Sequence, residues 1–198
     1  MRVKTLLGDD FIKSCIYLSD NIAKDYRPDI VIGVLTGGGY VGREISNNLK
    51  TISKHLYTEI RIQRKDTKKK DQGILHKVLQ MLPYFILDWL RMAEMLYEDT
   101  KAKKFNPKRE GIVAFPDEVS NCLKSGNCKV LVVDDAIDTG ATLKLIYDYI
   151  KDNYPSADVR IAVVTVTSNH PLIDADYCLF HDRTLVRFPW SNDVKLKK

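Results

Sequence analysis

The sequence predicts an α/β fold, in which helices flank a mostly parallel β-sheet. Short apolar runs that suit buried strands alternate with longer segments whose apolar residues recur at helical spacing. The runs at 30–35 and 129–133 lack polar alternation, which is expected where helices cover both faces of a parallel sheet. A length of 198 residues suits one domain over 1–198.

The first expected element is a helix that begins at Asp9 or Asp10 and runs to about Tyr26. Four apolar residues recur in it at helical spacing: Phe11, Cys15, Leu18 and Ile22. Further strands are expected at 30–35, 56–63, 129–133, 159–166, 177–180 and 185–188, and further helices at 41–49 and 141–153. No internal repeat or low-complexity linker divides the chain.

Residues 64–110 interrupt this alternation and are interpreted as an insertion within the domain. A basic loop at 64–73 leads into a helical stretch at 74–104, which Pro83 interrupts. One face of this stretch is apolar: Leu82, Phe85, Ile86, Trp89, Ala93 and Leu96. We expect that face to pack on its own domain. A homodimer interface is the next alternative, and an interfacial membrane contact the least favoured.

The net charge of +5 comes from one segment. Residues 61–70 carry six basic side chains and one acidic side chain, so the rest of the chain is neutral in sum. This pattern does not suggest a globally basic nucleic-acid binder, and no nucleic-acid partner is expected. Binding of nucleic acid through 61–70 remains a minor alternative, which a steep salt dependence would reveal.

Location is suggested by the cysteines and by hydropathy. No two of Cys15, Cys122, Cys128 and Cys178 have the spacing of a zinc or redox motif, so scattered thiols in a reducing compartment are expected. The N-terminus has no apolar signal-peptide core. The most apolar stretch, 81–90, is too short and too charged to span a membrane. A cytoplasmic location is expected.

Residues 130–142, VLVVDDAIDTGAT, combine an apolar strand, two carboxylates, a loop of small residues and the start of a helix. In open parallel sheets, ligands bind beyond the carboxyl ends of strands. The loop can direct backbone N–H groups and the hydroxyls of Thr139 and Thr142 toward a phosphate beside a helix N-terminus. Asp134 and Asp135 can accept hydrogen bonds from sugar hydroxyls, and their hard oxygens suit Mg²⁺.

The same segment closely resembles the signature of the type I phosphoribosyltransferases, which bind 5-phosphoribosyl-1-diphosphate (PRPP). The resemblance assigns the 5-phosphate to Asp138, Thr139, Gly140, Ala141 and Thr142. It assigns Asp134 and Asp135 to the ribose hydroxyls and to Mg²⁺. In purine-using members, the aspartate that matches Asp138 also faces the base and can act as its general base.

A second glycine-containing loop, Leu35-Thr36-Gly37-Gly38, ends the strand at 30–35 and opens on the same edge of the sheet. Glycines allow a backbone to approach a diphosphate closely. The loop resembles the family's pyrophosphate loop, which implies PRPP contacts for Thr36, Gly37 and Gly38. Many relatives carry a basic residue where Thr36 stands.

The C-terminal part resembles the base-binding end of bacterial xanthine/guanine/hypoxanthine-type members. Aligned on Pro189-Trp190, the aromatic residue that stacks on the purine becomes Leu185. Within 163–171, VVTVTSNHP, His170 stands where purine members often place a lysine. Trp190 can equally be an aromatic that closes the edge of the core. The resemblance therefore implies base contacts for His170 and Leu185, with an acceptor base that the sequence does not name.

The leading interpretation is a Mg²⁺-dependent phosphoribosyltransferase that moves the phosphoribosyl group of PRPP onto a purine-like base. Diphosphate and a nucleotide would be its products. The loop at 64–73 follows the second strand of the main sheet, where type I enzymes carry a lid that excludes water. Its lysines, Lys65, Lys68, Lys69 and Lys70, can neutralise the departing diphosphate. The alternative is a non-catalytic regulator of the same fold that senses PRPP or a nucleotide, because Thr36, His170 and Leu185 depart from the purine pattern.

Overall fold

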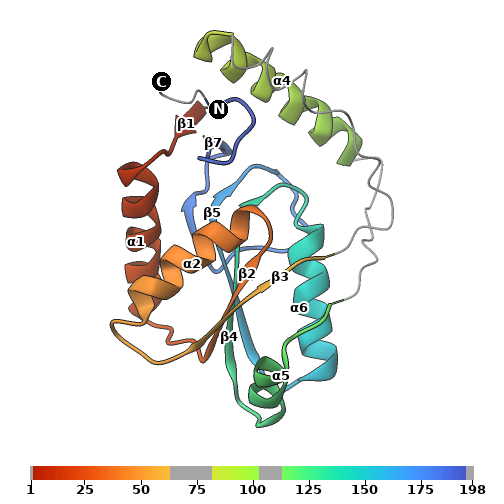
Figure 1. The fold of residues 1–198 in the computed structure, drawn as a ribbon. Helices are drawn as coiled ribbons and strands as arrows, with labels where there is room; N and C mark the ends of the chain where they lie inside the picture. Colours follow the sequence, from red (N-terminus) through yellow and green to blue (C-terminus); the bar gives the residue numbers. More distant parts are fainter. Residues whose placement is uncertain (1, 63–81, 103–112, 195–198) are drawn as a thin grey trace.

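The computed structural model describes residues 2–62, 82–102 and 113–194 (Figure 1). The elements are β1 (Arg2–Thr5), α1 (Asp9–Ala23), β2 (Ile30–Val34), α2 (Gly37–Leu49), β3 (Leu56–Ile60), α4 (Tyr84–Ala102), α5 (Asp117–Lys124), β4 (Lys129–Ile137), α6 (Ala141–Asn153), β5 (Asp158–Val166), β6 (Tyr177–Phe180) and β7 (Thr184–Arg187). Five strands form one sheet in the order β3-β2-β4-β5-β6, and every pairing in it is parallel. The predicted fold class, a mostly parallel sheet flanked by helices, is confirmed.

Helices cover both faces of the five-stranded sheet (Figure 1). On one face, α1 and α2 pack on Val31, Leu131 and Ala162. On the other face, α5 and α6 pack on Ile30 and Val132 together with neighbouring strand residues. All five residues of β2 are buried. Burial on both faces explains why its sequence is continuously apolar rather than alternating.

The order of the strands places the two candidate ligand loops next to each other. β2 and β4 are neighbours in parallel register, with Ile30 opposite Val130 and Gly33 opposite Val133. Both strands therefore end at the same edge of the sheet. The loop that begins at Thr36 and the acidic end of β4 lie side by side there.

A second, two-stranded sheet pairs the two ends of the chain. β1 lies parallel to β7, with Val3 opposite Leu185. The backbone N–H of Leu6 extends this contact by donating to the carbonyl of Arg187 at 2.9 Å. β1 was not predicted, because only one of its four residues is even half-buried and it carries no apolar alternation.

Among the other differences from expectation, two element boundaries shift and one helix is new. β4 continues to Ile137 rather than ending at 133, because its acidic residues still pair with β5. α2 begins at Gly37 instead of residue 41, so the glycine loop forms the first turn of a helix. α5 was not predicted, since eight residues are too few for a clear helical period.

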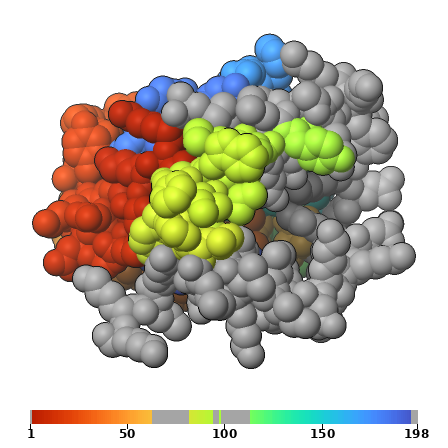
Figure 2. All heavy atoms as spheres, turned by 90° about the horizontal axis from the view of Figure 1, so that it is seen from above, coloured from red at the N-terminus to blue at the C-terminus, as the bar shows by residue number. Residues whose placement is uncertain are grey.

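The described part of the insertion is the helix α4, whose orientation is opposite to the one expected. Phe85 is 70% exposed and Trp89 is 65% exposed, whereas Leu87 is buried. Figure 2 shows the yellow-green atoms of α4 at the molecular surface beside the red atoms of the N-terminal part of the chain. The prediction that Phe85 and Trp89 are buried on their own domain is wrong. The basic loop at 64–73, with its four lysines, lies outside the described residues.

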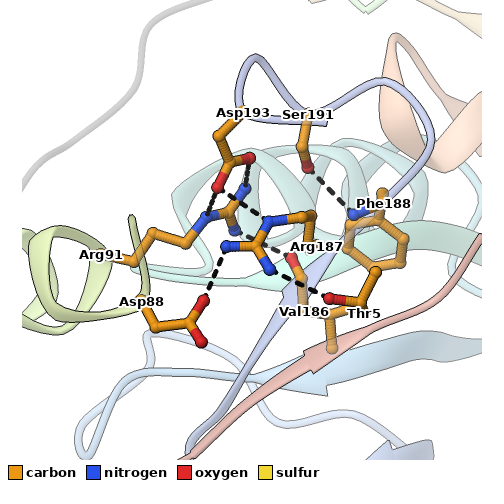
Figure 3. Close-up of polar contacts among 8 residues, drawn as sticks. All are labelled: Thr5, Asp88, Arg91, Val186, Arg187, Phe188, Ser191 and Asp193. Atoms are coloured by element: carbon orange, nitrogen blue, oxygen red, sulfur yellow. Dashed lines mark hydrogen bonds and ion pairs between the residues drawn. The ribbon is translucent and has the colours of Figure 1, made fainter. Parts of the chain in front are cut away.

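Polar contacts anchor the inward side of α4 (Figure 3). Arg91 donates from Nε to Asp193 at 2.8 Å and from Nη1 to the carbonyl of Val186 at 3.1 Å. Arg187, which is 1% exposed, pairs with Asp88 at 2.7 Å and with Asp193 at 2.9 Å. Asp88 and Arg91 lie three positions apart on α4, so both ion pairs form on the same face of the helix, the one that turns inward. Among the helices in the described ranges, none has the length and apolar character that crossing a bilayer requires.

Candidate functional site

The glycine loop and the acidic end of β4 are in direct contact. A Cβ atom added to Gly37 would lie 2.0 Å from Oδ2 of Asp135. One added to Gly38 would lie 2.6 Å from the carbonyl oxygen of Val133 and from Cα of Asp134. Any larger residue would collide with this strand end, so the close approach requires glycine at both positions. The peptide bond between Leu35 and Thr36 is cis.

Asp134 and Asp135 form a carboxylate pair that is largely withdrawn from water. Burial raises the pKa of Asp134 well above its ordinary value, and the neighbouring charge of Asp135 raises it further. Burial also raises the pKa of Asp135, against the lowering effect of a hydrogen bond from Trp190. The backbone N–H of Asp135 donates to Oδ1 of Asp134 at 2.9 Å. A pair of this kind gains from a ligand that brings positive charge or hydroxyl donors.

The loop after β4 forms the N-terminus of α6. Gly140 has a φ of 75° and serves as the N-cap residue, and helical geometry begins at Ala141. Thr139 accepts two hydrogen bonds. Its carbonyl accepts one from the N–H of Leu172 at 2.9 Å, and its side-chain hydroxyl accepts one from the N–H of Ala141 at 3.3 Å. Thr142 lies in the first turn of α6. The N–H groups of such a turn suit an anion.

Asp138 is exposed at the same edge and is held by a residue that sequence reasoning missed. The hydroxyl of Thr167 donates to Oδ1 of Asp138 at 2.6 Å. The carbonyl of Thr167 accepts from Nε of Arg183 at 3.0 Å. Thr167 directly follows β5, the neighbour of β4 in the sheet, and this adjacency was the only signal available in the sequence.

The two predicted base contacts lie on different elements. His170 is exposed in the loop after β5, where its backbone N–H donates to the hydroxyl of Ser168 at 3.1 Å. Leu185 is half-buried on β7, outside the five-stranded sheet. The hydroxyl of Thr165 donates to the carbonyl of Thr184 at 2.5 Å, which ties the start of β7 to β5.

A second missed contact comes from the C-terminal strap, which we define as residues 188–193. The indole N–H of Trp190 donates to Oδ2 of Asp135 at 3.0 Å. Of the two interpretations of Trp190, its ring packing on Tyr40 and Phe188 favours the one in which it closes the edge of the core. The hydrogen bond from Trp190 to Asp135 has no signature in the sequence, since the two residues are 55 positions apart.

Metal-binding capacity rests on the carboxylate pair. In the described ranges, no three or more His, Cys, Asp or Glu side chains converge as a complete metal cage. Two carboxylates alone fit the way Mg²⁺ binds, because this ion commonly takes one or two carboxylates together with water and phosphate oxygens of the substrate.

Comparisons with known proteins bear on the fold and on the family. No curated protein sequence matches the chain. It is similar in structure to a purine phosphoribosyltransferase from Pyrococcus horikoshii, with a TM-score of 0.59, 18% identity, and 100% of this chain and 99% of that chain covered. The Helicobacter pylori xanthine-guanine-hypoxanthine phosphoribosyltransferase gives a TM-score of 0.58 and 17% identity, covering 96% and 94%. A hypothetical protein from Neisseria gonorrhoeae with bound ppGpp gives 0.60 and 16%, covering 96% and 90%.

At these identities the structural likeness establishes the fold. The family is established by sequence, because the model of the phosphoribosyl transferase domain matches residues 7–193, nearly the whole chain. The match includes both loops at the edge of the sheet and the strap that contacts Asp135. The chain therefore belongs to the type I phosphoribosyltransferase family.

Proposed function

We propose that this protein transfers the 5-phosphoribosyl group of PRPP to a purine-like base and releases diphosphate. The observation that carries the proposal is the contact between Gly37 and the carboxylate of Asp135. It joins a loop suited to diphosphate with a strand end suited to ribose hydroxyls. The N-terminus of α6 supplies the anion site that a 5-phosphate needs.

Each part of PRPP has matching groups. Backbone N–H groups at 138–142 and the hydroxyls of Thr139 and Thr142 would hold the 5-phosphate. Asp134 and Asp135 would accept hydrogen bonds from the ribose hydroxyls. The backbone of Thr36, Gly37 and Gly38 would face the diphosphate, since no side chain separates Gly37 or Gly38 from the acidic pair.

Asp134 and Asp135 are also the residues that would hold Mg²⁺. Their raised pKa values reflect carboxylates that a divalent cation would stabilise in the charged form. When bound, Mg²⁺ would neutralise negative charge on the diphosphate.

Asp138 is proposed as the general base. A ring nitrogen of the base would attack C1 of the ribose while the bond from C1 to the diphosphate oxygen breaks, and its electron pair leaves with the diphosphate. The proton released from the ring nitrogen would pass to the Asp138 carboxylate. Thr167 would hold this carboxylate in one orientation through its 2.6 Å hydrogen bond.

His170 and Leu185 are proposed to contact the base. Leu185 would cover one face of it, and His170 would donate one hydrogen bond to an exocyclic oxygen. Neither residue reproduces the aromatic ring or the fixed cation of the purine-using relatives. The acceptor is therefore proposed as purine-like without further identification.

The test is diphosphate release with PRPP and Mg²⁺ across a panel of purines, pyrimidines and related heterocycles, alongside calorimetric titration of PRPP. Base-dependent release is expected for at least one purine. Measurable PRPP binding without diphosphate release for any base would reject the transferase activity, while the proposed PRPP-binding site would stand.

A second candidate is a regulator that binds PRPP or a nucleotide without turnover. It is favoured by Thr36, His170 and Leu185, and by the nucleotide ppGpp bound to the similar protein from Neisseria gonorrhoeae. Tight binding of a guanine nucleotide, unaltered nucleotide recovered after incubation, and no diphosphate release would together support it.

A further inference from the structure

Trp190 reaches the proposed PRPP site from a part of the chain far away in sequence. Its indole N–H donates to Oδ2 of Asp135 at 3.0 Å. The same oxygen is the atom that lies 2.0 Å from the Cβ position of Gly37. One carboxylate oxygen of Asp135 is thus placed between the glycine loop and the indole.

Aromatic side chains from α1, α2 and the strap itself contact the Trp190 ring. Phe188 stacks on it at a centroid distance of 4.8 Å and an angle of 4°, and Tyr40 stacks at 4.8 Å and 18°. Phe11 meets it edge-on at 5.4 Å. Tyr40 stands in the first turn of α2, directly after the three glycines. The ring therefore contacts the helix that carries the glycine loop as well as the acidic strand end.

The strap that carries Trp190 is itself fixed in place (Figure 3). The N–H of Phe188 donates to the hydroxyl of Ser191 at 3.0 Å, and the N–H of Ser191 donates to the carbonyl of Phe188 at 3.0 Å. Asp193 closes the strap through ion pairs with Arg187 and Arg91. A strap secured on both sides can hold the indole N–H in a constant position.

We propose that Trp190 is a positioning residue that orients the Asp135 carboxylate toward the ribose-diphosphate ligand. An indole nitrogen only donates and an ionised carboxylate only accepts, so the two groups suit each other as hydrogen-bond partners. Fixing Oδ2 removes the rotation of the carboxylate about its own axis, and it sets the direction in which Oδ1 points. The inference rests on the proposed function, because it takes PRPP as the ligand that Asp135 meets.

The test uses the two tryptophans of the chain, Trp89 and Trp190. Trp190→Phe removes the N–H donor and keeps an aromatic ring for stacking, whereas Trp89→Phe alters an exposed ring on α4 and is the matched control. PRPP affinity in the presence of Mg²⁺ is expected to fall about tenfold in Trp190→Phe, as for loss of one hydrogen bond to a charged group. It is expected to stay unchanged in Trp89→Phe. The KM for PRPP should rise in Trp190→Phe while the KM for the base does not.

Indole N–H signals in ¹H–¹⁵N spectra separate positioning from simple packing. Trp89→Phe assigns the Trp190 signal, and Asp135→Ala should shift that signal upfield while leaving the Trp89 signal in place. PRPP with Mg²⁺ should shift the Trp190 signal only. Equal midpoints of thermal unfolding for Trp190→Phe and wild type would show that the fold is intact.

The outcomes separate this inference from the proposed function. Two results would overturn the positioning role alone. In the first, wild type binds PRPP and Trp190→Phe binds it with equal affinity. In the second, the Trp190 signal does not shift in Asp135→Ala. Absence of PRPP binding in wild type would overturn the proposed function, and the positioning role along with it.

Discussion

Asp138 lies exposed at the edge of the sheet, with its carboxylate accepting a hydrogen bond from Thr167 at 2.6 Å. Replacement by asparagine keeps the shape and an oxygen acceptor for Thr167 but removes the basic carboxylate. We expect Asp138→Asn to lower kcat by roughly 10²–10⁴-fold, the usual contribution of a general base, and to leave PRPP affinity largely intact. Single-turnover rates and calorimetry would measure the two effects. Full activity in this variant would show that another group takes the proton.

Gly37 makes the tightest backbone approach of the site. A methyl group there would lie 2.0 Å from the Asp135 carboxylate, so the loop or the strand end must move. We expect Gly37→Ala to abolish measurable PRPP binding. Thr36→Ala alters the neighbouring exposed side chain without adding an atom, and it should weaken PRPP binding far less. Titration calorimetry on both variants tests this, and wild-type affinity in Gly37→Ala would contradict the proposed diphosphate loop.

At the scale of the element, α4 shows how little an apolar stripe says about burial. Leu87 is buried, whereas Trp89, two positions along, is 65% exposed. Leu87→Ala is expected to lower the free energy of unfolding by about 2–5 kcal/mol, while Trp89→Ala should change it by less than about 0.5 kcal/mol. Urea denaturation measures both. The reverse order would mean that α4 presents its other face to the domain.

The ion pairs beneath α4 predict a defined dependence of stability on pH. Burial alone would raise the pKa of Asp193, but hydrogen bonds and charge from Arg91 and Arg187 outweigh it, and the net effect lowers the pKa. The folded pKa thus lies below the unfolded one. Stability from this carboxylate is present above about pH 4 and is lost as the pH falls through the folded pKa.

Asp193→Asn is therefore expected to lower the free energy of unfolding by about 3 kcal/mol at pH 7, because the buried guanidinium of Arg187 and the half-buried one of Arg91 lose a charged partner. The difference from wild type should shrink as the pH falls below about 4, where Asp193 of the unfolded chain takes up a proton first, and it should be lost below the folded pKa. Denaturant titrations across pH 2.5–7 would measure it. Asp182→Asn is the control, since Asp182 pairs with Arg2 in an exposed position. A loss of stability independent of pH would contradict the role of this charge.

At the scale of the whole molecule, the site joins segments from both ends of the chain and from its middle. A ligand that binds there only in the folded state stabilises the whole fold. PRPP with Mg²⁺ at 100 times its Kd is expected to add about 2.7 kcal/mol to the free energy of unfolding, and a chelator should remove most of this gain. Differential scanning calorimetry with PRPP alone, Mg²⁺ alone and both together separates the contributions. An unchanged Tm with both present would argue against the site.

Local sequence patterns determined the fold class and the main motif. The apolar runs identified β2, β4 and β5, and the helical spacing identified α1 and α6, because each pattern reflects burial over a few neighbouring residues. Since the carboxyl ends of parallel strands share one edge, the glycine loop and Asp134-Asp135 were expected at the same place. The structure brings them into contact.

Only the tertiary structure decided which distant residues meet at that edge. The pairing of β1 with β7, the hydrogen bond from Thr167 to Asp138 and the one from Trp190 to Asp135 join residues 29 or more positions apart. No short-range pattern encodes such contacts, because they depend on how whole elements pack. The orientation of α4 follows the same rule: its sequence specifies a helix with an apolar stripe, but the side that faces inward carries Leu87 and the half-buried ion-paired side chains of Asp88 and Arg91.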